Sequence, residues 1–218
     1  MSTVFFEPEA RDRALMPHDP FKGLVVPRPI GWISTVSRAG QVNLAPYSFF
    51  NGVLSRPQIV GFASESEKDS AAFAIESGEF AWSLATWALR EQMNATSAGL
   101  PRGESEFAYA GLAAAPCRRV RAPRVAASPA AMECKVTQVV HVVDVEGRET
   151  GGVVVYGQVV GFHIDTRFLK NGRFDLAAVQ PIARCGYDEY ATVESVFSMQ
   201  RPAGGGDAFS AGKAAKAV

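Results

Sequence analysis

The hydrophobic residues of this 218-residue chain fall into short runs that predict β-strands. Runs of strand length cover residues 30–37, 42–50, 58–64, 80–86, 131–144 and 152–164. They are rich in valine, isoleucine and aromatic residues, which favour strands. Polar turns at 38–41 and 146–149 each separate two consecutive runs, so both pairs are predicted to form hairpins.

Two further segments have the features of short helices. Ser66 and Asp69 have capping-box spacing before an apolar segment, and Gly78 stands where a helix would end. A second helix is predicted over 87–98. The strands and helices do not alternate regularly, and no GxGxxG motif is present. The order therefore predicts a mainly β chain, an antiparallel β-barrel with short helices, rather than a Rossmann sheet.

Composition limits the classes of function. The chain has 22 basic and 22 acidic residues, so its zero net charge gives no reason to expect a nucleic acid or an anionic membrane as partner. No apolar run approaches the roughly 20 residues that a membrane helix needs. The N-terminus, with Glu7, Glu9 and Asp12, does not look like a signal peptide. We expect a cytoplasmic protein.

The chain divides into three parts by composition. Residues 1–25 form an N-terminal extension rich in proline and charged residues, and 26–202 form one domain. Residues 203–218 are rich in glycine and alanine, which predicts a flexible C-terminal tail.

Cysteine and histidine spacing argues against a metal site. The chain has three cysteines with no CxxC pair: Cys117, Cys134 and Cys185. We expect them to be reduced, mostly buried thiols. The three histidines are also scattered: His18, His141 and His163. No protein-bound metal is predicted, and a solitary histidine such as His163 is more often structural.

Three segments carry candidate binding chemistry. The strand at 30–37 ends in the hydroxyls of Ser34, Thr35 and Ser37, which suit phosphate oxygens but more commonly start a turn. Residues 43–51 combine aromatic and small polar side chains, which suit a flat aromatic cofactor or simply a core strand. Residues 64–70 precede a helix, where free N–H groups and Lys68 favour an anion, although three carboxylates oppose it.

The order of these segments resembles one family. PRPIGWISTVS (27–37), NLAPYSFFN (43–51), KDS (68–70), GEF (78–80) and MNATSA (93–98) occur in the order typical of the flavin reductase-like family, which has the FMN-binding split-barrel fold. The resemblance covers about residues 26–202. It implies a homodimer of split barrels, with one noncovalent FMN per subunit near the dimer interface.

The resemblance also implies roles for individual residues. It places Ser34, Thr35 and Ser37 near the phosphate end of FMN. It places Ser48, Phe49, Phe50 and Asn51 along the isoalloxazine ring. It places Ser64, Lys68, Asp69 and Ser70 around the phosphate or the ribityl chain, with Lys68 as the main phosphate contact. No catalytic residue is named, because the cofactor carries the chemistry.

The implied activity is that of an FMN-dependent oxidoreductase. A hydride would pass from NADH or NADPH through FMN to flavin, another small acceptor or a partner oxygenase. The Gly-Asp-His triplet that accompanies NADH use in shorter flavin reductases is missing. An FMN-binding electron carrier without its own nicotinamide site is therefore the alternative, and a non-redox flavin-binding dimer is a third possibility.

For two groups of residues the sequence allows both a structural and a functional interpretation. The basic run of Arg118, Arg119, Arg121 and Arg124 is typical of a charged strand edge, or it reaches the flavin phosphate of a partner subunit. Tyr187 and Tyr190 either line a planar ligand or pack in the core. We expect the three tryptophans to be core residues: Trp32, Trp82 and Trp87.

Overall fold

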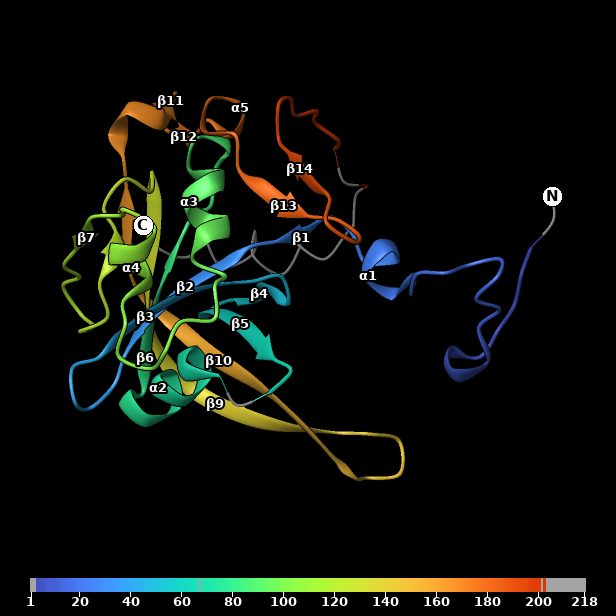
Figure 1. The fold of residues 1–218 in the computed structure, drawn as a ribbon. Coiled ribbons are helices and arrows are strands. Elements are labelled where there is room, and N and C mark those ends of the chain that lie inside the picture. Colours follow the sequence, from blue (N-terminus) through green and yellow to red (C-terminus); the bar gives the residue numbers. More distant parts are fainter. Residues whose placement is uncertain (1–2, 67, 201, 203–218) are drawn as a thin grey trace.

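The computed structural model describes residues 3–66, 68–200 and 202, so the predicted tail at 203–218 lies outside the described residues. One antiparallel seven-stranded sheet dominates the fold (Figure 1). In pairing order its strands are β3 (Val42–Tyr47), β2 (Gly31–Val36), β6 (Glu79–Ser83), β9 (Ala130–Val143), β10 (Glu149–Ile164), β5 (Gln58–Ser64) and β4 (Phe50–Ser55). The prediction of a mainly β barrel with short helices is confirmed.

The sheet curls until strand β3 lies beside β5. The amide of Ala63 in β5 donates to the carbonyl of Phe49 (2.8 Å), and the rings of Tyr47 and Phe62 lie 5.0 Å apart. The chain therefore passes directly from one edge of the sheet to the other through Ser48 and Phe49. This passage explains why residues 42–50 do not form the single strand predicted: β3 ends at Tyr47, and the unpredicted β4 begins at Phe50.

The inner face of the curled sheet is the main core. Phe62 and Phe80 are fully buried and meet edge to face at 5.4 Å, a geometry that aromatic pairs prefer. Gly157 in β10 makes room for this pair, since a Cβ atom there would lie 2.4 Å from Cε1 of Phe80. Burial of each such ring stabilises the fold by roughly 1.5–3 kcal/mol.

Strands β9 and β10 form a long hairpin that projects beyond the rest of the sheet (Figure 1). Its turn contains Asp144, whose side chain accepts from the amides of Glu146 (3.0 Å) and Arg148 (2.9 Å). Near this turn the apolar side chains of Val143 and Val145 are exposed. The predicted hairpin is thus present, with its turn one to two residues earlier than expected.

Small elements cover the ends of the barrel. The short strands are β1 (Arg28–Pro29), β7 (Ala114–Ala115), β8 (Arg124–Val125), β11 (Leu169–Lys170), β12 (Arg173–Phe174), β13 (Ile182–Arg184) and β14 (Tyr190–Thr192). The helices are η1 (Pro8–Ala10), α1 (Phe21–Leu24), α2 (Asp69–Ser77), η2 (Trp87–Leu89), α3 (Arg90–Ala95), α4 (Glu106–Tyr109), η3 (Thr166–Phe168) and α5 (Leu176–Val179). The segment before α1 extends away from the body (Figure 1).

Both predicted helices differ from expectation in detail. The predicted capping box is absent: Lys68, not Ser66, is the N-cap of α2, and no side chain caps the helix. Gly78 does end α2, in the left-handed conformation that favours glycine. The second helix is a 3₁₀ turn followed by α3, which ends at Ala95 and not at Ala98 as predicted; the hydroxyl of the C-cap residue Thr96 donates to the carbonyl of Met93 (2.7 Å). Among the described residues, no helix has the length and apolar character needed to cross a membrane.

Candidate functional site

The N-terminus of α2 has no side-chain cap. Lys68, at the N-cap, is exposed and forms no ion pair with any described residue. Because no side chain caps this nine-residue helix, the N–H groups of its first turn remain available. These groups and the positive end of the helix dipole favour an anion beside Lys68.

A buried carboxylate organises the side chains next to this helix start. Glu106, in α4, accepts hydrogen bonds from Nδ2 of Asn43 (2.8 Å) and from the amide of Leu44 (2.9 Å). Asn43 is thereby held with its Oδ1 toward α2, where it accepts a hydrogen bond from the hydroxyl of Ser70. The network fixes Ser70 at the first turn of α2.

Two of the carboxylates that would repel an anion here are paired with basic side chains. Asp69 Oδ1 lies 2.5 Å from Nη2 and 3.0 Å from Nε of Arg102. Glu65 lies 3.5 Å from Nζ of Lys22. Pairing therefore reduces the repulsion that the sequence suggested at this position, more at Asp69 than at the exposed Glu65.

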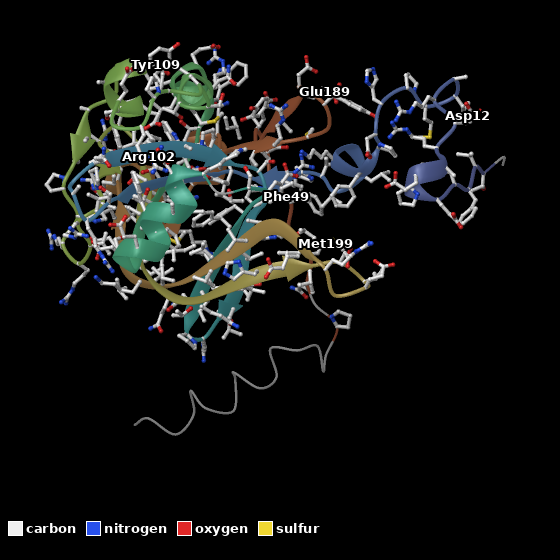
Figure 2. The ribbon with its side chains drawn as sticks, turned by 60° about the horizontal axis from the view of Figure 1, so that its bottom comes forward. Asp12, Phe49, Arg102, Tyr109, Glu189 and Met199 are labelled. Atoms are coloured by element: carbon white, nitrogen blue, oxygen red, sulfur yellow. The ribbon has the colours of Figure 1, made fainter. Side chains whose placement is uncertain are left out.

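The β3–β4 connection places Ser48 and Phe49 beside α1. The ring of Phe49 lies 6.3 Å from that of Phe21, with Lys22 Nζ at 5.6 Å and Arg28 Cζ at 5.7 Å from its centroid. Figure 2 shows Phe49 at the junction between the body and the N-terminal segment. This ring is therefore surrounded by cationic and aromatic groups at the surface.

Two adjoining cavities run across this region. The first, the α2 cavity, has a volume of about 660 Å³ and is lined by Asn43, Phe49, Lys68 and Ser70, among others. The second, the tyrosine cavity, has about 850 Å³ and is lined by residues that include Tyr187 and Tyr190. Both contain Lys22, Pro46, Ser48 and Ser97, so they form one continuous groove. Its size suits a cofactor together with a second small molecule.

The tyrosine cavity combines aromatic rings with guanidinium groups. Arg184 lies with Cζ 4.5 Å from the ring centroid of Tyr190, and Arg90 lies 4.0 Å from that of Trp87. Trp87 is 49% exposed, so its prediction as a core residue is wrong. Arg28 also lines this cavity, and its Nε is buried without a hydrogen-bond partner among the described residues. Glu91, which pairs with Arg90 at 3.3 Å, and Asp188 also line the cavity, so its lining is aromatic and mixed in charge and suits a planar molecule.

Five of the predicted site residues line the α2 cavity. They are Ser48, Phe49, Lys68, Asp69 and Ser70. They come from the β3–β4 connection and the start of α2, which the curled sheet brings together. The sequence segments from 43–51 and 64–70 therefore meet at one place.

The remaining six predicted residues do not line either cavity. Ser34, Thr35 and Ser37 are buried, and the Ser34 hydroxyl donates to the carbonyl of Pro123. Ser37 Oγ accepts from the amide of Gln41 (3.1 Å). This hydroxyl therefore starts a turn, the second of the two possibilities given for the segment.

The other three have local partners of their own. Ser64 is buried and donates to the carbonyl of Ser66 (2.6 Å). Phe50 stacks on Trp82 in the core, with centroids 5.8 Å apart. Asn51 is exposed on the edge strand β4, where its Oδ1 accepts from the amide of Gly52 (2.8 Å).

Several residues that line the groove were not predicted from the sequence. Arg102 and Glu106 come from the polar loop after 99 and from α4, and nothing in their local pattern points to a site. Asn43 begins the candidate segment 43–51, but it was not among the residues predicted to contact the cofactor. The cysteines also differ in part from expectation: all three are free, but only Cys134 is buried.

The hydroxyl of Tyr47 is a buried polar atom at the edge of the α2 cavity. Burial raises the pKa of Tyr47, and the neighbouring hydroxyls of Ser70 and Ser64 offset only part of this effect. No described residue satisfies this hydroxyl with normal hydrogen-bond geometry. Buried polar groups without a protein partner are uncommon, so this one favours a polar ligand in the cavity.

Known proteins identify the fold and its family. The family model described as "Flavin reductase like domain" matches residues 23–176. The chain belongs to the flavin reductase-like family. An uncharacterised protein of Halalkalibacterium halodurans is 35% identical over 83% of this chain and 88% of its own length.

Solved structures of related proteins agree with this assignment. Nitrilotriacetate monooxygenase component B from Bacillus cereus has a TM-score of 0.83 and 26% identity, covering 91% of this chain and all of that chain. The 2-nitrobenzoate 2-nitroreductase of Pseudomonas fluorescens has a TM-score of 0.79 and 22% identity, covering 92% and 97%, which shows a shared fold. This flavin reductase-like protein is therefore a flavin-related oxidoreductase by family.

The residues of the α2 cavity fit a flavin mononucleotide. The uncapped start of α2 with Lys68 and Ser70 suits its phosphate, and the unpartnered hydroxyl of Tyr47 suits a polar chain. The connection at Ser48 and Phe49 suits the edge of a flat ring. The groove therefore offers a complementary group to each part of the cofactor.

Proposed function

We propose that this flavin reductase-like protein is an FMN-dependent oxidoreductase that takes a hydride from NADH or NADPH and delivers electrons to flavin or another small acceptor. One observation carries the proposal: the uncapped start of α2, beside Lys68, opens into a cavity that continues into a second, aromatic one. The first part suits a flavin phosphate, and the second leaves room for a planar reaction partner.

The chain's own residues would hold the cofactor rather than carry out acid–base chemistry. Lys68 and the free N–H groups of α2 pair with the phosphate, while Ser70 is held in place by Asn43. Ser48 and Phe49 support the ring edge. When bound, FMN supplies the hydride-accepting and electron-transferring chemistry.

The tyrosine cavity would hold the nicotinamide donor. NADH and NADPH combine flat rings with negatively charged phosphates. Tyr187 and Tyr190 offer aromatic faces, and Arg184 offers positive charge beside Tyr190. These features support a nicotinamide site even though the Gly-Asp-His triplet is missing.

Rapid mixing separates the leading proposal from the electron-carrier alternative. We expect the purified protein to bind FMN, and its visible band to bleach when FMN-loaded protein is mixed with NADH or NADPH in an anaerobic stopped-flow instrument. Dithionite serves as the control for complete reduction. Reduction by dithionite but not by either nicotinamide would favour the carrier, and failure to bind FMN at all would contradict both.

Pairing into a homodimer is part of this proposal. The edge strand β4 exposes Val53 and Leu54, and the projecting hairpin exposes Val143 and Val145. Exposed apolar side chains on an unpaired strand edge are typical of a surface covered by another chain. Light scattering coupled to size-exclusion chromatography should give about twice the monomer mass of 23.3 kDa.

The electron acceptor and the compartment are also proposals. The Bacillus cereus protein is described as a monooxygenase component, which supports a partner oxygenase as one destination of the electrons. Three free cysteines suit the reducing cytoplasm. Cofactor-reduction assays with and without added FMN, or a candidate oxygenase, would identify the acceptor.

A further inference from the structure

A third cavity lies away from the flavin groove. It has a volume of about 640 Å³ and is lined by residues before and after β8 and by the end of β10. Its charged lining includes Arg118, Arg119 and Arg124. It shares no lining residue with the α2 cavity or the tyrosine cavity. We call it the arginine cavity.

A buried glutamate shapes one wall of the arginine cavity. The carboxylate of Glu133 accepts from the backbone amides of Arg118 (2.9 Å), Arg119 (2.5 Å) and Val120 (3.1 Å). His163 Nε2 lies 2.7 Å from its Oε1. Burial alone would raise the pKa of Glu133, but these hydrogen bonds outweigh it and hold the pKa below the ordinary value. The carboxylate is therefore satisfied by backbone amides and His163.

The guanidinium groups of this cavity lack carboxylate partners. Arg118, Arg119 and Arg124 form no ion pair within the part of the chain that the structure describes, and Nε of Arg124 is buried without a hydrogen-bond partner there. Arg121, from the same run, does pair with Glu79 (3.2 Å). The other carboxylate of the cavity, Asp165, binds Arg167 at 2.5 Å. The cavity thus has an excess of positive charge.

The same place does not suit a metal cation. Ligand atoms of Cys117, Glu133 and His163 do lie within 4.8 Å of one another. However, the oxygens of Glu133 are already occupied by amide donors, and burial together with Glu133 raises the pKa of Cys117 to about 11, which keeps the thiol protonated. The neighbouring arginines also repel a cation. Anion binding is the chemistry that remains.

We propose that the arginine cavity binds a small polyvalent oxyanion, a phosphate compound or a polycarboxylate, at a site separate from the flavin groove. Guanidinium groups match both classes because each presents a planar fork of N–H donors to paired oxygens. The unpartnered Nε of Arg124 supplies a buried donor for one of those oxygens. Phe162, 56% exposed at the rim, adds an apolar wall for any organic part of the ligand.

Calorimetry with two probes tests this site. FMN-loaded full-length protein, in which the cofactor occupies the α2 cavity, is titrated at low salt with inorganic pyrophosphate and, separately, with citrate. We expect binding of at least one probe, weakened about tenfold or more in Arg124→Gln and in Arg119→Gln, because each removes a charge-assisted contact. The probe that binds more tightly shows which class the cavity prefers. Near-ultraviolet circular dichroism and flavin content check that both variants fold.

Two control variants locate the binding. Arg13→Gln, on the exposed N-terminal segment, removes the same charge outside all three cavities and should leave the affinity unchanged. Lys68→Ala, titrated with enough FMN to keep the α2 cavity saturated, tests the flavin groove, and an anion bound in the arginine cavity should keep its affinity in this variant. Loss of binding in Lys68→Ala but not in Arg124→Gln would place the anion in the flavin groove and overturn the proposal. Equal anion affinity in all variants would overturn it as well, even if the arginine variants changed the oligomeric state of the protein. If the protein proves not to carry FMN, the same titrations on unloaded protein still decide this question.

Discussion

Arg102 Nη2 lies 2.5 Å from Oδ1 of Asp69, joining the loop after α3 to the first turn of α2 (Figure 2). Its Nε donates to the same oxygen at 3.0 Å. The pair neutralises a carboxylate that stands next to Lys68 in the α2 cavity. Positive charge at this helix start is therefore available to a ligand rather than consumed inside the protein.

Removal of Arg102 should weaken FMN binding through Asp69. In Arg102→Gln the carboxylate becomes unpaired and repels the phosphate, so we expect a several-fold loss of FMN affinity, measured by fluorescence quenching of the flavin. The effect on unfolding should stay within about 1 kcal/mol, because the Arg102 side chain is 63% exposed. The double variant Asp69→Asn/Arg102→Gln should recover much of the loss. Equal losses in the single and double variants would mean that Arg102 contacts the ligand itself.

Replacement of Lys68 tests the phosphate site most directly. Lys68→Ala removes a cation beside the free N–H groups of α2, and we expect FMN to bind about tenfold more weakly, a loss of about 1.4 kcal/mol. The matched control is Lys170→Ala, which removes an exposed lysine from β11, outside the groove. The two variants should differ in FMN affinity and agree in urea unfolding. Unchanged affinity in Lys68→Ala would move the phosphate away from α2.

Strand pattern and motif order predicted most of the fold and part of the site. Apolar runs of strand length, rich in β-branched and aromatic residues, located β2, β5, β9 and β10. The site residues at 48–49 and 68–70 were predicted because the order of their motifs matches the family. The charge balance around Lys68 was not predictable, since Arg102 and Glu106 reach the site through tertiary folding alone.

The incorrect predictions have specific physical causes. The strand at 42–50 breaks because the sheet closes on itself between Tyr47 and Phe50, and barrel closure leaves no mark in local periodicity. Trp87 looks like a core residue by composition, yet its ring packs under Arg90 beside the groove. The basic run contains one arginine paired with Glu79 and others that line a cavity, a division that sequence spacing does not reveal.

Gly157 should not tolerate a side chain. A Cβ atom at this position would lie 2.4 Å from Cε1 and 2.6 Å from Cζ of Phe80, and 3.1 Å from Cβ of Cys134. We expect Gly157→Ala to destabilise the protein by about 1–3 kcal/mol in urea unfolding, the usual cost of overpacking. Gly52→Ala, in the edge strand β4 with no atom within 4 Å, is the control and should change stability far less. Similar stability of both variants would mean that the Phe80 ring moves aside freely.

Two buried glutamates should make the protein sensitive to acid. Burial alone would raise the pKa of Glu79, but hydrogen bonds from Lys135 (2.5 Å) and Arg121 (2.8 Å) outweigh it and hold the pKa below 4.5, and the pKa of Glu133 is lowered in the same way. The folded state therefore binds fewer protons than the unfolded state, so the stabilisation is complete above pH 4.5 and is lost as the pH falls through the folded-state pKa values.

We expect urea midpoints to fall steeply below about pH 5, and less steeply in Glu79→Gln and Glu133→Gln, which start from lower stability at neutral pH. Glu104→Gln, at an exposed loop position, should keep the wild-type slope. A wild-type slope in both buried variants would show that other carboxylates carry the acid response.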